Sequence, residues 1–230
     1  MPPAARPLYL HEVIDIVGQG AVPYMEQTVT FDTERSAGRG LELFGTWYVV
    51  GATGRWPQVV NVWELADGWE GWRRLVRSTN LGREENQALS DWWDEAYRRR
   101  TGGFDRVLGP APGCPSRASL RHAGVRGSLF VHELSTVQPG TGPQYLAAVT
   151  DAWVEVMADH GHHLVGLWEV LFGDTEVVTM WATDLDAHVS LQQSTDPRIA
   201  AWRATARRWR TRWREELLVP HRGTALWAPP

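Results

Sequence analysis

Residues 8–12 (LYLHE) return as residues 129–133 (LFVHE), 121 positions later in the chain. Residues 43–47 (LFGTW) return as residues 164–168 (LVGLW) with the same offset. The offset of 121 positions holds from residue 8 to residue 47 without a gap, and such a match does not arise by chance. The chain therefore contains two copies of one structural unit, and this unit decides the fold.

The two copies differ in length mainly in their turns. Tyr24 and Tyr145 keep the offset of 121, whereas Trp63 and Trp181 lie 118 positions apart because the turn before them is shorter in the second copy. Length changes in turns cost little free energy. The difference is therefore compatible with two copies of the same fold.

A segment rich in proline and glycine separates the copies. Residues 109–116 read GPAPGCPS, and a basic stretch continues to Gly127. Proline and glycine at this density are typical of a linker. We expect a first unit over residues 1–108, a linker over residues 109–127 and a second unit over residues 128–230.

The second copy shows its elements most clearly, through alternation in strands and a period of 3.6 in helices. The expected elements are strands at 129–136, 164–172, 176–182 and 217–226, and helices at 143–159, 184–193 and 196–216. Their order, β-α-β-β-α-β with one extra short helix, is that of a ferredoxin-like unit. The fold class is therefore α+β, with two tandem ferredoxin-like units whose antiparallel sheets face each other as an intrachain α/β barrel.

The long helix expected near the C-terminus carries a strongly basic segment. Asp196 and Pro197 form a helix start signal, and Trp209 and Trp213 have the spacing of one buried helix face. An offset of 116 matches Trp93 with Trp209. We interpret the arginines around them as the solvated face of this helix and not as a nucleic-acid surface.

Composition excludes several classes of protein. Lys and Arg total 23 against 27 acidic residues, for a net charge of −4, so neither nucleic acid nor an anionic membrane is expected as a partner. Every basic residue is arginine, a bias typical of GC-rich genomes such as those of actinobacteria, so lysine chemistry is excluded. Cys114 is the single cysteine and forms no intrachain disulfide. The N-terminus carries no apolar segment, and we expect a cytoplasmic protein.

Strand alternation assigns side chains to the two faces of each sheet. On the first strand of each unit, Tyr9, His11, Phe130 and His132 are expected inside the barrel. The same reasoning places further side chains in the lumen, namely Tyr48, Asn61, Trp63, Glu169, Thr179 and Trp181.

This lumen is predicted to be a small-molecule site, because aromatic walls with a few polar groups are typical of ligand pockets. The substrate-binding candidates are Trp63, Trp181, Tyr9, Phe130, Tyr48, Asn61 and Thr179. The catalytic candidates are His132 and His11 as proton shuttles and Glu169 as a base or orienting carboxylate. The alternative is that both histidines are paired in a packed interior. Glu12 and Glu133 are expected at the strand ends on the outside of the barrel, or as capping residues.

The histidines of the chain raise two cofactor hypotheses, a metal ion and haem. Residues 159–163 (DHGHH) lie where a helix leads into a strand, so neighbouring side chains diverge and no metal site is expected. Haem needs one histidine that projects alone into a large cavity. His132 and His11 are the candidates for that role, and haem remains an alternative to the expected cofactor-free chemistry.

The second copy resembles the NIPSNAP family. The resemblance rests on HEL at 132–134, PG at 139–140, LVGLW at 164–168, the strand at 177–181 and DP at 196–197 leading to AW at 201–202. Ser135 stands where the family carries arginine, so any role of that arginine is not transferred. The resemblance implies the dimeric α/β-barrel superfamily, which contains cofactor-free monooxygenases, polyketide cyclases, haem enzymes and proteins without known catalysis.

These observations predict a cytoplasmic enzyme of secondary metabolism that acts on a small apolar or aromatic metabolite. Its chemistry is expected to be cofactor-independent acid/base catalysis of the cyclase, isomerase, lyase or monooxygenase type. One alternative is a non-catalytic module that binds a small molecule or a partner, and a second is a haem-binding protein. A homodimer is a further possible assembly.

Overall fold

The computed structural model describes residues 6–32, 40–81 and 87–230. Residues 1–5, on which the expectation about the N-terminus partly rests, lie outside the described residues. The strands in the described ranges are β1 (Leu8–Ile16), β2 (Glu42–Val49), β3 (Gln58–Leu65), β4 (Arg100–Pro110), β5 (Leu129–Val137), β6 (His163–Val170), β7 (Glu176–Thr183) and β8 (Arg210–Pro220). They close into one antiparallel barrel in the order β1-β3-β2-β8-β5-β7-β6-β4.

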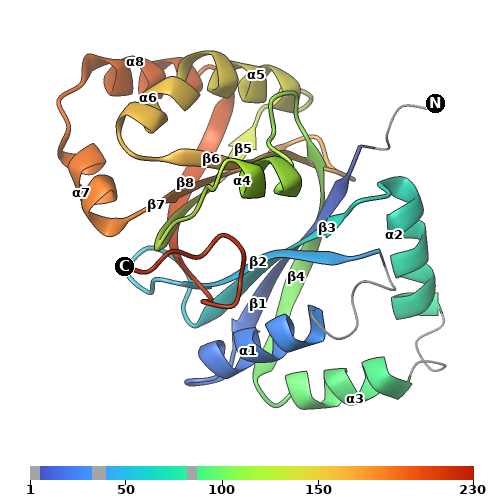
Figure 1. Cartoon of the computed structure of the whole chain (residues 1–230). Coiled ribbons are helices and arrows are strands. Elements are labelled where there is room, and N and C mark those ends of the chain that lie inside the picture. The colour runs from blue at the N-terminus through green and yellow to red at the C-terminus, as the bar shows by residue number, and fades with distance from the viewer. Residues whose placement is uncertain (1–5, 33–39, 82–86) are drawn as a thin grey trace.

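The helices lie outside the barrel, and each unit covers its own sheet (Figure 1). The first unit carries α1 (Ala21–Phe31), α2 (Trp69–Val76), the π-helical segment η3 (Arg77–Leu81) and α3 (Gln87–Ala96). The second unit carries α5 (Gly142–Ala152), α6 (Val154–Asp159), α7 (Leu185–Gln193) and α8 (Pro197–Ala206). A short helix, α4 (Arg117–His122), lies between the units. Within the described ranges, none of these helices is long and apolar enough to cross a membrane.

Each unit contributes a four-stranded sheet of ferredoxin-like order. The sheets are β4-β1-β3-β2 and β8-β5-β7-β6, and they join where β2 pairs with β8 and where β4 pairs with β6. The α+β class and the intrachain barrel of two facing sheets are therefore confirmed. Both seams are short, with three paired positions each, and this leaves much of β4 and β8 without a partner on one side.

The prediction of one long helix over residues 196–216 is wrong in its second half, which forms a strand. Asp196 does cap a helix, because its side chain accepts a hydrogen bond from the amide of Arg198, but α8 ends at Ala206 and β8 begins at Arg210. Residues 210–218 pair with β5, and from Glu215 onward burial alternates with a period of two. The barrel needs these residues as its fourth strand, and tertiary pairing overrides the helical spacing of the tryptophans.

The end of each unit consequently aligns with an offset of 110, not the 116 expected from Trp93. Ala96 and Ala206 end equivalent helices, and Arg100 and Arg210 begin equivalent strands. The register supports this alignment, since each arginine pairs with the last residue of the first strand in its own unit. The repeat therefore extends through the whole of both units.

The repeated Gly-x-Trp sequence builds the centre of the barrel. Trp47 and Trp168 are fully buried in the lumen, and each indole folds back over the glycine two residues before it. A Cβ atom on Gly45 would lie 2.2 Å from the Trp47 indole, and one on Gly166 would lie 1.8 Å from that of Trp168. The strand register shifts at both glycines. The motif is therefore a β-bulge that only glycine allows.

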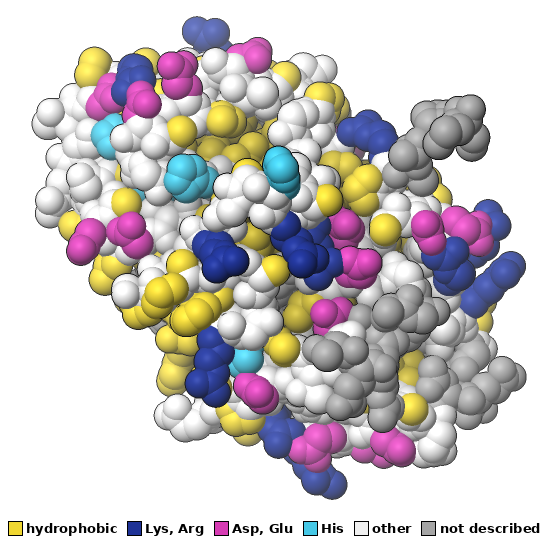
Figure 2. Space-filling view, in the orientation of Figure 1, with side chains coloured by type: hydrophobic (Ala, Val, Ile, Leu, Met, Phe, Trp, Pro, Cys, Tyr) yellow, Lys and Arg dark blue, Asp and Glu magenta, His cyan; other side chains and the backbone are white. Residues whose placement is uncertain are grey.

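Charges of both signs are interspersed on the molecular face drawn in Figure 2. Arginine and acidic side chains lie next to one another across this face and do not gather by sign. The chain forms ion pairs on its surface, such as those of Arg198 with Asp159 and Asp196. The pattern agrees with the small net charge of the chain.

Candidate functional site

The barrel lumen holds four of the expected residues, and it is packed. Tyr9, Phe130, His11 and His132 face inward and are almost completely buried. Aromatic rings fill the space around them, with Tyr9 and Trp168 at a centroid distance of 5.4 Å. The substrate-binding role predicted for Tyr9 and Phe130 stays a prediction, because their immediate surroundings are hydrophobic core.

Four other residues expected in the lumen lie on the opposite face of the sheet. The cause is the pairing register, because directly opposite residues share a face. His11 pairs with Val62, so the valine faces inward, and Trp63 pairs with Leu10 on the helix-covered face. The same correction applies to all four residues, namely Asn61, Trp63, Thr179 and Trp181.

The inward assignment of Tyr48 and Glu169 is also wrong. Because of the bulges, Trp47 and Trp168 take the inward positions, and Tyr48 packs on the helix-covered side. Glu169 is half-buried on the outer face beside Gly142, where α5 begins. The expected cost of a carboxylate beneath a helix does not apply there, because a helix N-terminus favours negative charge.

The corrected faces bring a carboxylate and its donors together in the second unit. Glu133 on β5 is buried beneath the helices, contrary to the expectation that it lies outside or caps a strand end. Its Oε2 accepts hydrogen bonds of 2.7 Å from the Trp181 indole and from the Thr179 hydroxyl. Its Oε1 accepts a bond of 3.0 Å from the Trp213 indole on β8. Three strands thus hold one carboxylate in place.

A pocket of about 260 Å³ lies over this carboxylate, between the sheet and the helices α6, α7 and α8. Its apolar walls are formed by Trp153, Met157, Leu191, Ile199, Trp202 and Trp213. Trp153 and Trp202 are stacked with ring centroids 5.6 Å apart. A pocket with aromatic walls and a buried polar group at its floor is typical of a small-molecule site.

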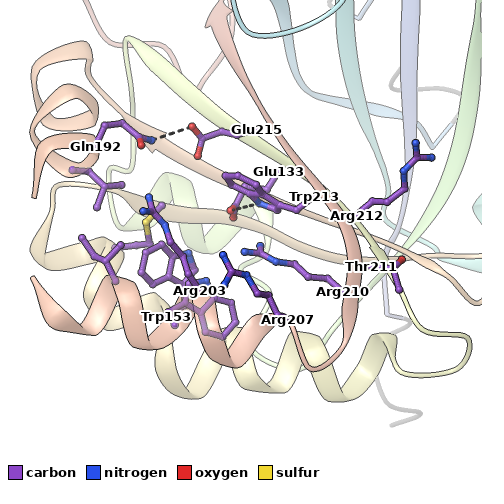
Figure 3. Close-up of a pocket in the computed structure, with 14 residues that line it drawn as sticks. Glu133, Trp153, Gln192, Arg203, Arg207, Arg210, Thr211, Arg212, Trp213 and Glu215 are labelled. Carbon is purple, nitrogen blue, oxygen red and sulfur yellow. Dashed lines mark hydrogen bonds between the residues drawn. The ribbon is translucent and has the colours of Figure 1, made fainter. Parts of the chain in front are cut away.

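One side of the pocket is strongly basic. Arg203 and Arg207 come from α8 and its end and Arg210 from the start of β8, and Figure 3 shows all three beside the hydrogen-bonded pair of Glu133 and Trp213. The Arg210 guanidinium lies 4.9 Å from the centroid of the Trp213 ring. The described residues offer no acidic partner within salt-bridge distance of these three arginines. Their charges are therefore available to an anionic ligand.

The opposite side of the pocket is held by a chain of histidines. His162 directs Nδ1 at the carbonyl of His160 at 2.8 Å and Nε2 at Nδ1 of His188 at 3.3 Å. His188 and Gln192 both approach Oε1 of Glu215, at 3.4 and 3.2 Å. Burial lowers the pKa of His162 to about 4, so this ring is neutral at pH 7. No three potential ligands are gathered for a metal ion in the described ranges, and the chain instead fixes the pocket wall.

The first unit contains an equivalent carboxylate in a different setting. Oε2 of Glu12 accepts hydrogen bonds from the Trp63 indole at 2.7 Å and from the Asn61 amide at 3.0 Å. Burial and the neighbouring charge of Asp105 raise the pKa of Glu12, against the opposing effect of these donors and of the Arg100 charge. A pocket of about 330 Å³ beside it is lined by aromatic residues and the two acids. The duplicated pockets have therefore diverged, one acidic and one basic.

A set of four residues recurs around the two buried glutamates. Each unit keeps a glutamate, the tryptophan bound to it, a tyrosine and an arginine, in the pairs Glu12 and Glu133, Trp63 and Trp181, Tyr24 and Tyr145, Arg100 and Arg210. Three of these pairs were visible as sequence repeats. The arginine pair lies 110 positions apart, and the apparent match of Trp93 with Trp209 at 116 positions obscures it.

Solved structures with the same architecture include proteins that are named after oxygen-dependent enzymes. An anthrone oxidase-like protein is 10% identical with a TM-score of 0.65, and the match covers 98% of this chain and 97% of that protein. A provisionally named monooxygenase from Fusobacterium nucleatum is 11% identical with a TM-score of 0.62, and the match covers 94% and 93% of the two chains. At these identities the likeness shows the fold, which is that of the ferredoxin-like dimeric α/β barrels.

A NIPSNAP domain protein is among the solved structures that are similar to part of this chain. A NIPSNAP domain protein from Burkholderia xenovorans is 20% identical, but it matches only 41% of this chain, with a TM-score of 0.37. No family model matches the sequence. No curated protein matches it either. The fold class is therefore established, and the family and the reaction are left to proposal.

Proposed function

We propose that this protein is an enzyme that binds a small aromatic or enolisable compound in the helix-covered pocket of the second unit. Glu133 removes a proton from the compound, and Arg203, Arg207 and Arg210 stabilise the anion that forms. The observation that supports this most is the placement of a buried, firmly held carboxylate at the floor of an aromatic pocket, beside three guanidinium groups that have no acidic partner among the described residues.

The hydrogen bonds of Glu133 leave one oxygen able to act. Oε2 already accepts from Trp181 and Thr179, whereas Oε1 accepts only from Trp213. A carboxylate oxygen has more than one acceptor site, so Oε1 can take a proton from a ligand in the pocket. A guanidinium group then holds the developing enolate or phenolate charge without reorganisation.

Two outcomes for the anion fit this site. It can rearrange, as in an isomerase, cyclase or lyase, or it can react with molecular oxygen. In the oxygen reaction of an anthrone, the CH₂ group becomes a carbonyl with one oxygen atom, and the second oxygen atom leaves as water with the two hydrogens. The names of the two structural neighbours, a monooxygenase and an anthrone oxidase-like protein, favour the oxygen reaction.

Oxygen uptake with anthrone as the probe tests the proposal. We expect stoichiometric uptake by the native protein and a loss of at least about 100-fold in rate for Glu133→Gln, since general base catalysis contributes about 10²–10⁴-fold. Glu12→Gln is the matched control, because Glu12 makes the same bond to its own tryptophan. Loss of activity in Glu12→Gln with full activity in Glu133→Gln would place the reaction in the first unit and overturn the proposal.

A non-catalytic binding module is the second candidate. It is favoured by the three hydrogen bonds of Glu133, which is the number expected of a structural carboxylate. Quenching of the pocket tryptophans by anthrone, with neither oxygen uptake nor any change in the compound, would support this candidate. Haem finds little support in this pocket, because His, Cys and Tyr are all missing from the residues that line it within the described chain. A Soret band in the purified protein would reverse that conclusion.

The remaining expectations belong to the same proposal. They are the NIPSNAP relationship, a role in secondary metabolism, a cytoplasmic location, a homodimer and chemistry without a cofactor. The sequence pattern of residues 129–202 supports the first of them. A native mass measurement on the purified protein tests the dimer, and its absorption spectrum tests the cofactor.

A further inference from the structure

The centre of the barrel contains a buried polar cluster that the proposed reaction does not use. His11 and His132 lie on strands β1 and β5, which are opposite walls of the barrel, with their ring centroids 5.1 Å apart. Nδ1 of His132 lies 3.2 Å from Oε2 of Glu216, and this carboxylate also pairs with Arg214 at 3.1 Å. Arg106 lies directly opposite His11 on the neighbouring strand.

Several polar atoms of this cluster are buried without a hydrogen-bond partner among the described residues. Four of them are both ring nitrogens of His11, Nε2 of His132 and Nη1 of Arg106, and Oε1 of Glu216 has only its ion pair with Arg214. Buried polar atoms in folded proteins almost always have a partner, which is either protein, ordered water or a ligand. Four such atoms around one point indicate that something else completes the cluster.

The barrel wall is open beside this cluster. The pairing of β4 with β6 covers only Leu108–Pro110, and a groove of about 540 Å³ occupies the space next to the unpaired part of β4. Its lining includes Phe104, Arg106, Leu134, Glu176, Arg212 and Arg214. Figure 3 shows Arg212 pointing away from the arginines of the helix-covered pocket. The groove therefore lies beside that pocket and shares Arg212 and Trp213 with it, but not Glu133 or the three arginines of its basic side.

The equivalent opening on the other side of the barrel is closed by a longer turn. Both sides share one bond, from the amide of Val50 to the carbonyl of Leu217 and from the amide of Leu171 to the carbonyl of Val107, each 2.8 Å long. The longer turn adds a second bond on its own side, where the amide of Leu217 donates to the hydroxyl of Thr53 at 2.9 Å. The corresponding turn of the second unit is three residues shorter, as the change of offset from 121 to 118 shows. The difference in turn length thus leaves one entrance open.

The groove has the chemistry of a site for a small organic anion. It presents three guanidinium groups against the carboxylates of Glu176 and the nearby Glu216. Arg106 binds Glu176 through Nε and Nη2 and leaves Nη1 free on the buried side. The Arg106 guanidinium also lies 4.5 Å from the centroid of the Phe104 ring, which offers an apolar surface.

We propose that this groove binds a small organic carboxylate, with its apolar body on Phe104 and Leu134 and its carboxylate on the guanidinium group of Arg106. His11 does not line the groove but is paired with Arg106 on the neighbouring strand, where its neutral ring can take either tautomer. Arg212, at the rim, adds a second positive charge. The site is independent of the enzymatic proposal, because it shares neither the carboxylate nor the basic side of the helix-covered pocket.

Calorimetric titration with benzoate tests this site, with the neutral amide benzamide as a control ligand. We expect benzoate to bind and benzamide to bind at least about tenfold more weakly, because a charge-assisted bond is lost. Arg106→Gln should weaken benzoate binding by at least about tenfold for the same reason. Glu176→Gln should strengthen it, since it removes the acid that competes for Arg106.

Matched variants keep the test decisive if Arg106→Gln perturbs the fold. Arg73→Gln, which changes an exposed arginine that lines neither pocket, should leave benzoate affinity within about twofold, because surface changes away from a site have small effects. Arg203→Gln reports separately on binding in the helix-covered pocket. Benzoate should also shift the imidazole NMR signals of His11 and His132. The proposal is overturned if benzoate does not bind, if Arg203→Gln and not Arg106→Gln removes binding, or if Glu176→Gln has no effect.

Discussion

The bond between Glu133 and the Trp181 indole should be worth more than an ordinary hydrogen bond. Replacing Glu133 with alanine leaves the Trp181 N–H and the Thr179 hydroxyl without their acceptor. Each unsatisfied buried donor costs about 1–3 kcal/mol, so we expect a loss of about 4 kcal/mol in the free energy of unfolding. The Trp213 indole is half-exposed and can turn to water, and it therefore adds little.

A double-mutant cycle isolates the single bond. We expect a coupling free energy of about 1.5–3 kcal/mol between Glu133→Ala and Trp181→Phe, because the acceptor is charged and the N···O distance is 2.7 Å. The assay is urea unfolding followed by circular dichroism, which avoids the overlapping signals of 14 tryptophans. The same cycle on Glu12 and Trp63, whose bond is also 2.7 Å long, gives the internal comparison.

A coupling below about 0.5 kcal/mol in the second unit would refute this reasoning, since values of that size arise between residues that do not interact. It would mean that the indole and the carboxylate are not hydrogen-bonded in solution. The description of the pocket floor would then be wrong, and the proposed catalytic role of Glu133 would lose its structural basis.

Three further predictions concern other parts of the chain. Burial raises the pKa of Glu12, so its contribution to stability is complete in acid and is lost as the pH rises through this raised pKa. Glu12→Gln should therefore flatten the decline in unfolding free energy above the ordinary titration range of a carboxyl group, and an unchanged slope would contradict this. Gly166→Ala forces a Cβ atom into the indole of Trp168 and should cost at least about 3 kcal/mol in urea unfolding, while Gly173→Ala, with open space, should cost under about 1 kcal/mol. Burial raises the pKa of Cys114 to about 12, so this thiol should react with Ellman's reagent at pH 8 much more slowly than free cysteine, and rapid labelling would show that the thiol is exposed.

Much of the architecture was accessible from the sequence because the unit occurs twice. The constant offset at the first strand, at Tyr24 and Tyr145, and at the Gly-x-Trp motif established two equivalent units without any structural information. Glycine and proline marked the segment between them. A ferredoxin-like unit buries one face of its sheet under its own helices and needs a cover for the other, so two units in one chain indicated facing sheets.

The site was less accessible, because strand faces depend on register. Alternation shows which residues share a face within one strand, but it does not show which face of the next strand they meet. The bulges at Gly45 and Gly166 shift the register in β2 and β6, and they turn Trp47 and Trp168 into the lumen. Each shift places the candidate on its strand, Tyr48 on β2 and Glu169 on β6, on the outer face of the sheet and not in the lumen.

The sequence by itself thus determined that the chain has two copies of one unit, which elements most of each copy forms and which side chains recur. Only the tertiary structure decided that Trp209 and Trp213 do not share a helix, that Glu133 faces the helices, and that Arg203 and Arg210 lie beside it. The physical reason is that local spacing sets which residues share a face, whereas pairing between strands and the closure of the barrel set which faces meet.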